Sequence, residues 1–238
     1  MVSSPSGLVT FLVSACAVSK KFVSVMLVKG VFPTRSVVGV LTTALVVLVG
    51  AASVWSAEQS IVVVGDSLSS GHGMRIEHSW VSKLEDRLKS EGYGYEVVNA
   101  SISGDTSSGG LARLPRILAR QQPAIVIIEL GGNDGLRGLP VSNLRANLAA
   151  MIELTQNHSA TAVLTGIQIP PNYGPSYTEA LANIYPELAS EFKIPLVNFL
   201  MEGVALDTEL MQSDGIHPNA RGNDVMLENV WAVLIDLL

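Results

Sequence analysis

After residue 58, short apolar runs alternate with longer segments in which apolar residues recur every three or four positions. The runs are 61–64, 97–98, 125–128, 162–164 and 196–197. The first run is apolar at every position, so it should be buried on both faces, as central parallel strands are. Strands that alternate with helices form a parallel sheet covered by helices. The pattern therefore predicts that residues 58–238 form one α/β domain, a three-layer α/β/α sandwich around a mostly parallel five-stranded sheet.

Four segments have the spacing of a helix with one buried side. Their apolar stripes are Trp80, Leu84 and Leu88; Leu144, Leu148, Met151 and Ile152; Ala180, Leu181, Ile184 and Leu188; and Met226, Val230, Leu234 and Leu237. The last helix should begin near Ala220 and pack back on the sheet. No internal repeat or low-complexity linker interrupts this series, which favours a single domain.

The first 57 residues differ from the rest in charge. They contain Lys20, Lys21, Lys29 and Arg35 and no acidic residue, and an uncharged run rich in Val and Leu spans about 37–52. Small residues follow the run. Basic residues, an apolar run and small residues in this order are typical of a secretory signal peptide. We therefore expect residues 1–57 to be an export segment and the domain to be exported, to the periplasm in a bacterium.

Two alternatives stay open for this segment. The apolar run is long enough to cross a bilayer, so residues 37–55 would associate with the membrane if the signal were not cleaved. The domain would then be anchored with its body outside the cytoplasm. Met26 also begins a better-formed signal sequence than Met1 does, so residues 1–25 need not belong to the natural product.

The part after Ala57 is acidic. Removing the four N-terminal cations from the 15 Lys and Arg leaves 11, against 21 Asp and Glu, a formal charge of −10. Phosphate binding needs a basic face, so we expect no nucleic-acid partner. The single cysteine, Cys16, lies in the N-terminal segment, which excludes thiolate metal sites and cysteine nucleophiles in the domain. Neither the dinucleotide nor the phosphate-loop glycine motif occurs, so we expect no cofactor.

Polar segments rich in glycine or serine follow the first three predicted strands. They are Gly65-Asp66-Ser67-Leu68-Ser69, Asn99-Ala100-Ser101-Ile102-Ser103-Gly104-Asp105 and Gly131-Gly132-Asn133-Asp134-Gly135. Ligands of open parallel sheets bind beyond the carboxyl ends of the strands. These three loops should therefore open onto one edge, and the segment 213–218, ahead of the final helix, is placed to return His217 to it.

Ser67 is the candidate nucleophile, because a hydroxyl after a strand and near a helix N-terminus lies beside free backbone N–H groups. His217 is the candidate general base, and Asp214 can accept a hydrogen bond from its other ring nitrogen. Plainer interpretations exist: an N-cap for Ser67 and a surface turn for the Asp-Gly and His-Pro pairs. His72, five residues past Ser67, is the most serious competitor for the base.

A tetrahedral intermediate needs hydrogen-bond donors aimed at its oxyanion. The backbone N–H groups of Ser67 and Gly104 and the side chain of Asn133 would supply them. Glycine and asparagine also tolerate left-handed turns, which explains each of these residues individually. Asp66 is interpreted as a turn or cap residue without a chemical step. The α/β-hydrolase elbow G-x-S-x-G does not occur, because Ser69 stands where its second glycine belongs.

Four ordered blocks resemble the SGNH (GDSL) hydrolase family. They are Gly-Asp-Ser-Leu-Ser with Ser67, Ala-Ser-Ile-Ser-Gly-Asp-Thr with Gly104, Gly-Gly-Asn-Asp-Gly with Asn133, and Asp-Gly-Ile-His-Pro with Asp214 and His217. The similarity runs from about residue 61 to the end, including Gly109 to Pro115, and is strongest to bacterial periplasmic enzymes described as acyl-CoA thioesterase, lysophospholipase or arylesterase. Four blocks in one order make chance agreement improbable.

The resemblance implies a flavodoxin-like fold, no metal, and hydrolysis of esters or thioesters through an acyl-enzyme. It implies that Ser67, His217 and Asp214 form a catalytic triad and that Ser67, Gly104 and Asn133 form the oxyanion hole. The expected partners are small acyl esters or lysophospholipids. The sequence departs from the family at Gln168 and in the loop 136–140, which leaves the acyl chain length undetermined. A function of a different class is an acyl- or glycan-binding protein that keeps this fold without turnover.

Overall fold

The computed structural model describes residues 59–238, and the expectations for residues 1–57 lie outside this part of the chain. Within this range, five strands form one sheet, in the order β2-β1-β3-β4-β5. They are β1 (Gln59–Gly65), β2 (Tyr95–Asn99), β3 (Ile125–Glu129), β4 (Thr161–Thr165) and β5 (Leu196–Val197). All four neighbouring pairs are parallel. The predicted fold class is therefore confirmed, and the strand order is that of flavodoxin-like folds.

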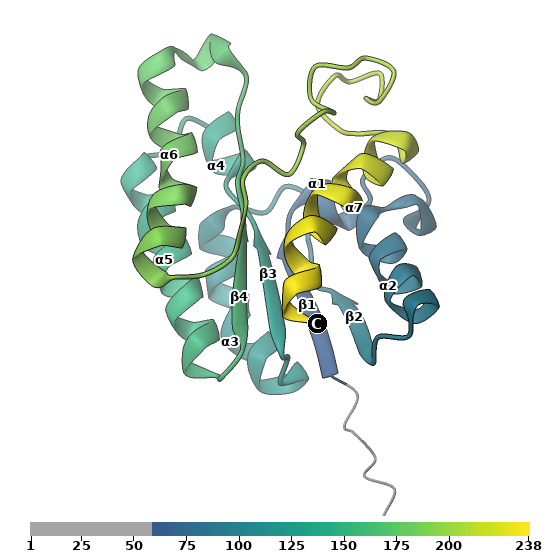
Figure 1. The fold of residues 1–238 in the computed structure, drawn as a ribbon. Coiled ribbons are helices and arrows are strands. Elements are labelled where there is room, and N and C mark those ends of the chain that lie inside the picture. The colour runs from purple at the N-terminus through teal and green to yellow at the C-terminus, as the bar shows by residue number, and fades with distance from the viewer. Residues whose placement is uncertain (1–58) are drawn as a thin grey trace, which may run out of the picture. The chain divides into compact units, whose positions relative to one another are not determined.

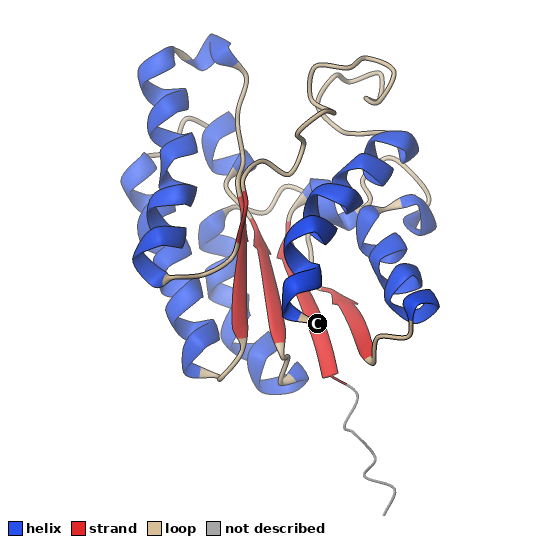
Figure 2. Ribbon diagram, viewed as in Figure 1, coloured by secondary structure: helices blue, strands red, loops and turns tan. Residues whose placement is uncertain are grey.

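Helices cover both faces of the sheet (Figure 1, Figure 2). The α-helices are α1 (Ser67–Ser70), α2 (Trp80–Glu91), α3 (Ser107–Gln121), α4 (Gly132–Leu136), α5 (Val141–Asn157), α6 (Pro175–Phe192) and α7 (Ala220–Leu234). Short 3-10 helices are η1 (Ile76–His78), η2 (Pro171–Tyr173) and η3 (Ile235–Leu237). No helix within residues 59–238 combines the length and the apolar character needed to cross a membrane.

The two faces of β1 belong to two separate cores. Val62 and Val64 pack with the buried sides of α3, α5 and α6. Ile61 and Val63 pack with those of α2 and α7. All four side chains are fully buried, as the unbroken apolar run predicted. Burying one such side chain stabilises the fold by about 1.5–3 kcal/mol, so β1 fixes both layers and the position of the loop that follows it.

The structure differs from the predicted helices in three places. Helix α3 was not predicted, because Gly109, Gly110 and Pro115 obscure a stripe whose buried members include Leu114 and Leu118. In α6 the predicted stripe residue Ala180 is exposed, and Tyr185 is buried instead. Leu237 lies in η3, beyond the end of α7. The differences at α3 and at Leu237 concern weak helix formers and a helix end, where periodicity carries little information. At Ala180 the period predicted a helix correctly, and only the position of its buried side differs.

Strands β1 and β3 are neighbours although β2 lies between them in sequence. The chain leaves β1 towards one side of the sheet and β3 towards the other, which creates the crevice where open α/β sheets bind ligands. Gly65 and Glu129, the last residues of these strands, are paired. The loop after β2 also reaches this point, because the Ile102 N–H donates to the Gly65 carbonyl at 3.0 Å. The prediction that these loops share one edge is confirmed.

The long connection from β5 to α7 returns to the same edge (Figure 1). An antiparallel bridge pairs Met211 with Pro218. Asn219 then caps α7 by accepting hydrogen bonds from Arg221 N and Gly222 N at 2.9 and 3.1 Å. The bridge at Pro218 and the cap at Asn219 directly follow His217 in sequence. They fix the backbone beside His217 just before α7 begins.

Candidate active site

The nucleophile turn, defined here as residues 65–69, joins β1 to α1. Asp66 caps this helix, because its Oδ1 accepts a hydrogen bond from Leu68 N at 3.0 Å. The plainer interpretation of Ser67 as an N-cap is therefore wrong, and Ser67 is the first residue inside the helix. Its backbone N–H has no acceptor within residues 59–238. Such a free N–H carries a partial positive charge that favours an anion beside it.

Ser67 contacts His217, although 150 positions separate them in sequence. The distance from His217 Nε2 to Ser67 Oγ is 2.9 Å. On its other side, His217 Nδ1 lies 2.7 Å from Asp214 Oδ2. Both distances are within the range for proton transfer or a charge-assisted hydrogen bond. The three side chains therefore form one continuous chain of hydrogen bonds that ends at a half-buried hydroxyl.

The carboxylate of Asp214 organises its own loop. Its Oδ1 accepts hydrogen bonds from Ile216 N at 2.9 Å and from His217 N at 3.0 Å. These bonds hold the pKa of Asp214 well below its ordinary value, with the His217 backbone N–H as the largest cause, followed by the His217 ring. Asp214 is therefore ionised throughout the neutral pH range. The loop orients the carboxylate although its side chain is 41 % exposed.

The predicted oxyanion donors come from three loops. Gly104 has a left-handed backbone, with φ of 80°, and its N–H has no acceptor within residues 59–238. The Gly104 carbonyl points elsewhere, since it accepts a 2.7 Å hydrogen bond from Arg137. Asn133 donates one amide hydrogen to Asp66 Oδ2 at 2.9 Å. Its second amide hydrogen and the N–H groups of Ser67 and Gly104 remain available to a ligand.

The structure also places the competing histidine. The ring of His72 lies 4.4 Å from that of His217, measured between centroids, with a tilt of 39°. The backbone N–H of His72 donates to the Ser67 carbonyl at 3.5 Å, but no hydrogen bond joins the His72 ring to Ser67 Oγ in the described residues. His158 bonds the Leu154 carbonyl at the end of α5, in a different part of the chain. His217 is thus the histidine that reaches the candidate nucleophile.

Two carboxyl groups at the nucleophile turn are buried, Asp66 within the turn and Glu129 beneath it. The interpretation of Asp66 as a cap residue is confirmed, whereas sequence reasoning missed Glu129. Asp66 is 2 % exposed and Glu129 is fully buried. Burial raises the pKa of Asp66 to about 6. Burial, and then the charge of Asp66, raise the pKa of Glu129 well above its ordinary value. The available signal was an acidic residue that directly follows the four-residue apolar run 125–128.

Arg113 of α3 is a second feature that the sequence motifs did not explain. Its Nε donates to Asp105 Oδ2 at 2.8 Å, and its Nη2 donates to the Gly65 carbonyl at 3.2 Å. Its Nη1 also donates to the Ala100 carbonyl. One guanidinium therefore joins the nucleophile turn to the loop that carries Gly104. Arg113 lies in the segment 109–115, which was part of the family resemblance in the sequence.

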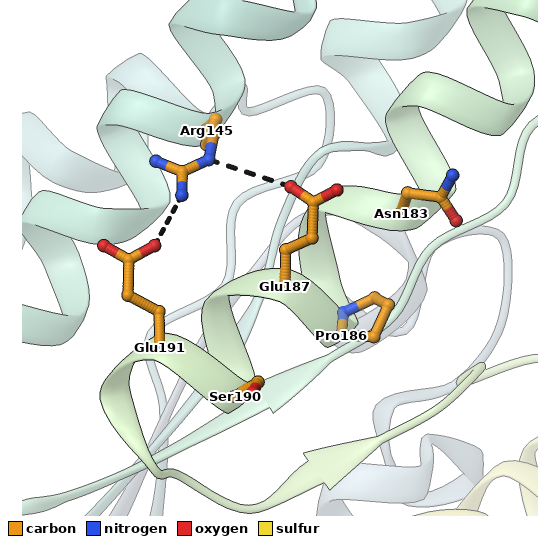
Figure 3. Close-up of a pocket in the computed structure, with 6 residues that line it drawn as sticks. All are labelled: Arg145, Asn183, Pro186, Glu187, Ser190 and Glu191. Atoms are coloured by element: carbon orange, nitrogen blue, oxygen red, sulfur yellow. Dashed lines mark hydrogen bonds and ion pairs between the residues drawn. The ribbon is translucent and has the colours of Figure 1, made fainter.

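A surface hollow of about 580 Å³ lies between α5 and α6 and contains none of the candidate site residues (Figure 3). Arg145 forms part of its wall, and its guanidinium is paired with Glu187 and Glu191. No cluster of three metal-binding side chains occurs in residues 59–238.

Comparison with known proteins gives the family. Residues 63–225 match the model of the GDSL-like lipase/acylhydrolase family, which covers more than half of the chain. The chain belongs to this family. The resemblance noted from the four sequence blocks is thereby confirmed, and the matched range includes every candidate site residue. Members of the GDSL-like lipase/acylhydrolase family hydrolyse acyl esters, and this chain is accordingly a carboxylic ester hydrolase.

Curated relatives of this GDSL-like hydrolase are named for ester hydrolysis. Esterase TesA of Pseudomonas aeruginosa is 52% identical over 77% of this chain and 91% of its own length. An arylesterase of Vibrio mimicus is 44% identical over 75% of this chain and 90% of its own length. Thioesterase 1/protease 1/lysophospholipase L1 of Escherichia coli is 46% identical over 69% of this chain and 77% of its own length.

Solved structures agree with the GDSL-like hydrolase assignment. The crystal structure of TesA matches with a TM-score of 0.74 at 52% identity, covering 76% of this chain and all of that chain. A psychrotrophic esterase, EstA from Pseudoalteromonas sp., in a structure inhibited by monoethylphosphonate, matches with a TM-score of 0.72 at 37% identity. That match covers 75% of this chain and 98% of the other.

Proposed function

We propose that this ester hydrolase works through a catalytic triad of Ser67, His217 and Asp214. The observation that carries the proposal is the continuous chain of hydrogen bonds from Asp214 Oδ2 through the His217 ring to Ser67 Oγ, with distances of 2.7 and 2.9 Å. Nucleophile, base and orienting carboxylate in this arrangement are the parts that activate a serine hydroxyl. Their convergence from the two ends of the domain supports a shared task.

In the acylation step, Ser67 Oγ attacks the carbonyl carbon and His217 Nε2 takes the hydroxyl proton. The C–O or C–S bond to the leaving group then breaks, and His217 returns the proton to the departing alcohol or thiol. The acyl group is left on Ser67 as an ester. Water attacks this ester with His217 again as the base, the carboxylic acid leaves, and Ser67 recovers its proton. Asp214 stabilises the imidazolium formed in each half-reaction.

We propose that the oxyanion of both tetrahedral intermediates binds between Ser67 N, Gly104 N and Asn133 Nδ2. The two backbone N–H groups are free in the described residues, and Asn133 keeps one amide hydrogen available. The first turn of α1 adds its partial positive charge. Losing one donor of an oxyanion hole typically lowers kcat by about 10²–10³-fold.

The proposed substrates are acyl esters, thioesters and lysophospholipids of small to moderate size, the classes named for the relatives. The basic residues and the apolar run at 37–52 support export of the domain. Export would narrow the range of substrates. Coenzyme A is a cytoplasmic compound, so an exported enzyme meets esters and lysophospholipids instead. We propose residues 58–238 as the mature domain, and N-terminal sequencing of the secreted protein together with membrane fractionation tests cleavage against anchoring.

The test of the triad is turnover of p-nitrophenyl esters of increasing acyl length. Ser67→Ala and His217→Ala are expected to lower kcat by at least about 10³-fold. Ser190→Ala and His158→Ala are matched controls, because both residues are exposed and lie away from the nucleophile turn, and they should keep the wild-type rate. His72→Ala tests the competing base. Comparable turnover in Ser67→Ala would overturn the proposed triad, and no turnover in the wild type would favour a binding protein.

A further inference from the structure

The carboxyl group of Glu129 lies directly beneath the nucleophile turn. Glu129 ends β3 and is paired with Gly65, which ends β1. Its Oε2 accepts a 2.7 Å hydrogen bond from Ser69 Oγ and a 3.2 Å hydrogen bond from Asp66 N. These two donors stand immediately before and two residues after Ser67. One carboxyl oxygen therefore holds the turn on both sides of the candidate nucleophile.

Gly65 and Ser69 are explained by this contact. A Cβ atom on Gly65 would lie 2.5 Å from Glu129 Oε2 and 2.9 Å from Ser69 Oγ, closer than real Cβ contacts. The glycine therefore leaves the space that the carboxyl group occupies. Ser69 stands where the α/β-hydrolase elbow has a second glycine, and its hydroxyl donates to the carboxyl group instead. The three residues form one interlocked unit.

The surroundings of Glu129 do not favour a charge. None of the ion pairs within residues 59–238 includes Glu129 or Asp66. Glu129 Oε1 is buried and has no hydrogen-bond partner among the described residues. An unpaired buried carboxylate is far more costly than a neutral acid, and a second carboxylate nearby adds repulsion.

Other ionisable groups near the turn are already engaged. They are Asp66, Asp105, Arg113, Asp134, Tyr185 and His217. Arg113 is paired with Asp105 and bonds the Gly65 carbonyl, and Tyr185 donates to the Leu130 carbonyl at 3.0 Å. Asp66 accepts from Leu68 N and from Asn133. Asp66, with its bond to the amide of Asn133, is therefore the better holder of the single negative charge.

We propose that Glu129 is a positioning residue of the hydrolase and that it holds the nucleophile turn as a neutral carboxylic acid. This deepens the proposed function and rests on it. As a neutral group, Glu129 fixes Asp66 N and Ser69 Oγ and leaves Asp66 ionised to orient Asn133. It contacts neither substrate nor Ser67 Oγ, so it acts on the reaction only through the geometry of the turn.

The experiment compares Glu129→Met, Glu129→Gln and Ser69→Ala with the wild type on a soluble short-chain p-nitrophenyl ester. Glu129→Met removes both hydrogen bonds and should lower kcat about tenfold or more. KM should change less than about twofold, because substrate binding is untouched. Glu129→Gln keeps a neutral acceptor and should restore kcat to within about threefold of the wild type. Ser69→Ala, which loses one of the two bonds, should fall in between.

A matched control separates positioning from general loss of stability. Thr155 is fully buried, and its Oγ1 donates to the Met151 carbonyl at 2.8 Å, within α5. Thr155→Val should lower the melting temperature and leave kcat unchanged. If Glu129→Met does not fold, the comparison of Ser69→Ala with Thr155→Val decides, and equal kcat in these two overturns the positioning role.

The neutral form has a readout of its own. The infrared difference spectrum between the wild type and Glu129→Gln at about pH 7 should contain the carbonyl band of a protonated carboxylic acid. A carboxylate band there, or Glu129→Gln as slow as Glu129→Met, overturns the neutral acid. Wild-type kcat in Glu129→Met overturns the whole proposal. An inactive wild type would instead refute the proposed function, which keeps the two failures distinguishable.

Discussion

The two halves of the candidate site are built differently. The nucleophile half, with Ser67, rests on buried Asp66 and Glu129 and on strands that are buried on both faces. The base half, with Asp214 and His217, lies in a long connection whose Asp214 side chain is 41 % exposed. In this second half, hydrogen bonds from the backbone to the Asp214 side chain, and not burial in the core, hold the loop in shape. The difference teaches that packing can fix a nucleophile, whereas an exposed base needs its own carboxylate to hold it.

The comparison predicts its largest effect at Asp214. Asp214→Asn should lower kcat/KM by roughly 10³-fold, because an amide neither fixes the useful imidazole tautomer nor stabilises the imidazolium. Asp207→Asn is the matched control, since Asp207 makes a similar turn in the same connection, with Oδ1 accepting from Glu209 N at 2.9 Å. Steady-state kinetics on a p-nitrophenyl ester measures both. Equal losses would mean that loop shape alone matters.

Replacing Asn133 tests the contact between the loop after β3 and the nucleophile turn, which the bond from Asn133 to Asp66 joins. Asn133→Ala should lower kcat by about 10²-fold, through loss of an oxyanion donor. The KM should change much less than kcat, because an oxyanion donor acts in the transition state. The bond from Asn133 to Asp66 would also be lost. Asn143→Ala, at an exposed position early in α5, should keep the wild-type rate. A change confined to KM in Asn133→Ala would show that the amide binds substrate without stabilising the transition state.

Gly65 tests whether the buried half depends on close packing. Gly65→Ala places a methyl group 2.5 Å from Glu129 Oε2 and should lower the free energy of unfolding by about 1–3 kcal/mol. Gly94→Ala is the control, because nothing lies within 4 Å of a Cβ atom at that position. Denaturant titration measures both changes. A Gly65→Ala protein as stable as Gly94→Ala would contradict the interlock of Gly65, Ser69 and Glu129.

A smaller effect is expected at Gln212, which links the connection that carries His217 to the segment that carries His72. Its Nε2 donates to the His72 carbonyl at 2.8 Å and to the Pro218 carbonyl at 3.0 Å. Gln212→Ala should lower kcat by about fivefold, because the connection around His217 loses one anchor. Gln156→Ala removes one hydrogen bond from an exposed glutamine on α5 and should leave kcat unchanged. An unchanged Gln212→Ala would show that Asp214 suffices to hold the base half.

The pH dependence of stability should have opposite signs in the two halves. The pKa of Glu129 is raised by burial, so the folded protein keeps a proton that the unfolded chain loses near 4.5, and stability falls as the pH rises above that value. Asp66 adds to this fall between 3.8 and about 6. The pKa of Asp214 is lowered, so its contribution is present above 3.8 and is lost as the pH falls below it.

Glu129→Gln isolates the buried contribution. Its stability relative to the wild type should rise as the pH increases above about 4.5, by at most about 1.4 kcal/mol per pH unit. Urea titrations at several pH values measure this difference. A difference that does not change with pH would mean that Glu129 titrates normally in the folded protein.

The sequence by itself determined the fold class and brought the candidate residues to one edge. The apolar run 61–64 and the alternation of strands and helices are consequences of burial, which acts at every position and leaves a period in the sequence. The polar loops after β1, β2 and β3 share an edge because parallel strands end on the same side. The same reasoning missed α3, whose glycines and proline weaken the helical signal.

Only the tertiary structure decided which groups touch. That the His217 ring and not the His72 ring bonds Ser67 Oγ, and that Glu129 lies beneath the turn, depend on contacts between segments far apart in sequence. That Asp66 and not Ser67 caps α1 depends on the local backbone geometry of the turn. Hydrogen bonds and pKa shifts depend on local geometry and on burial, and neither leaves a period in the sequence. The sequence shows that a glutamate follows the apolar run 125–128. It does not show that this glutamate contacts the nucleophile turn, because that contact exists only when β1 and β3 are neighbours in the sheet.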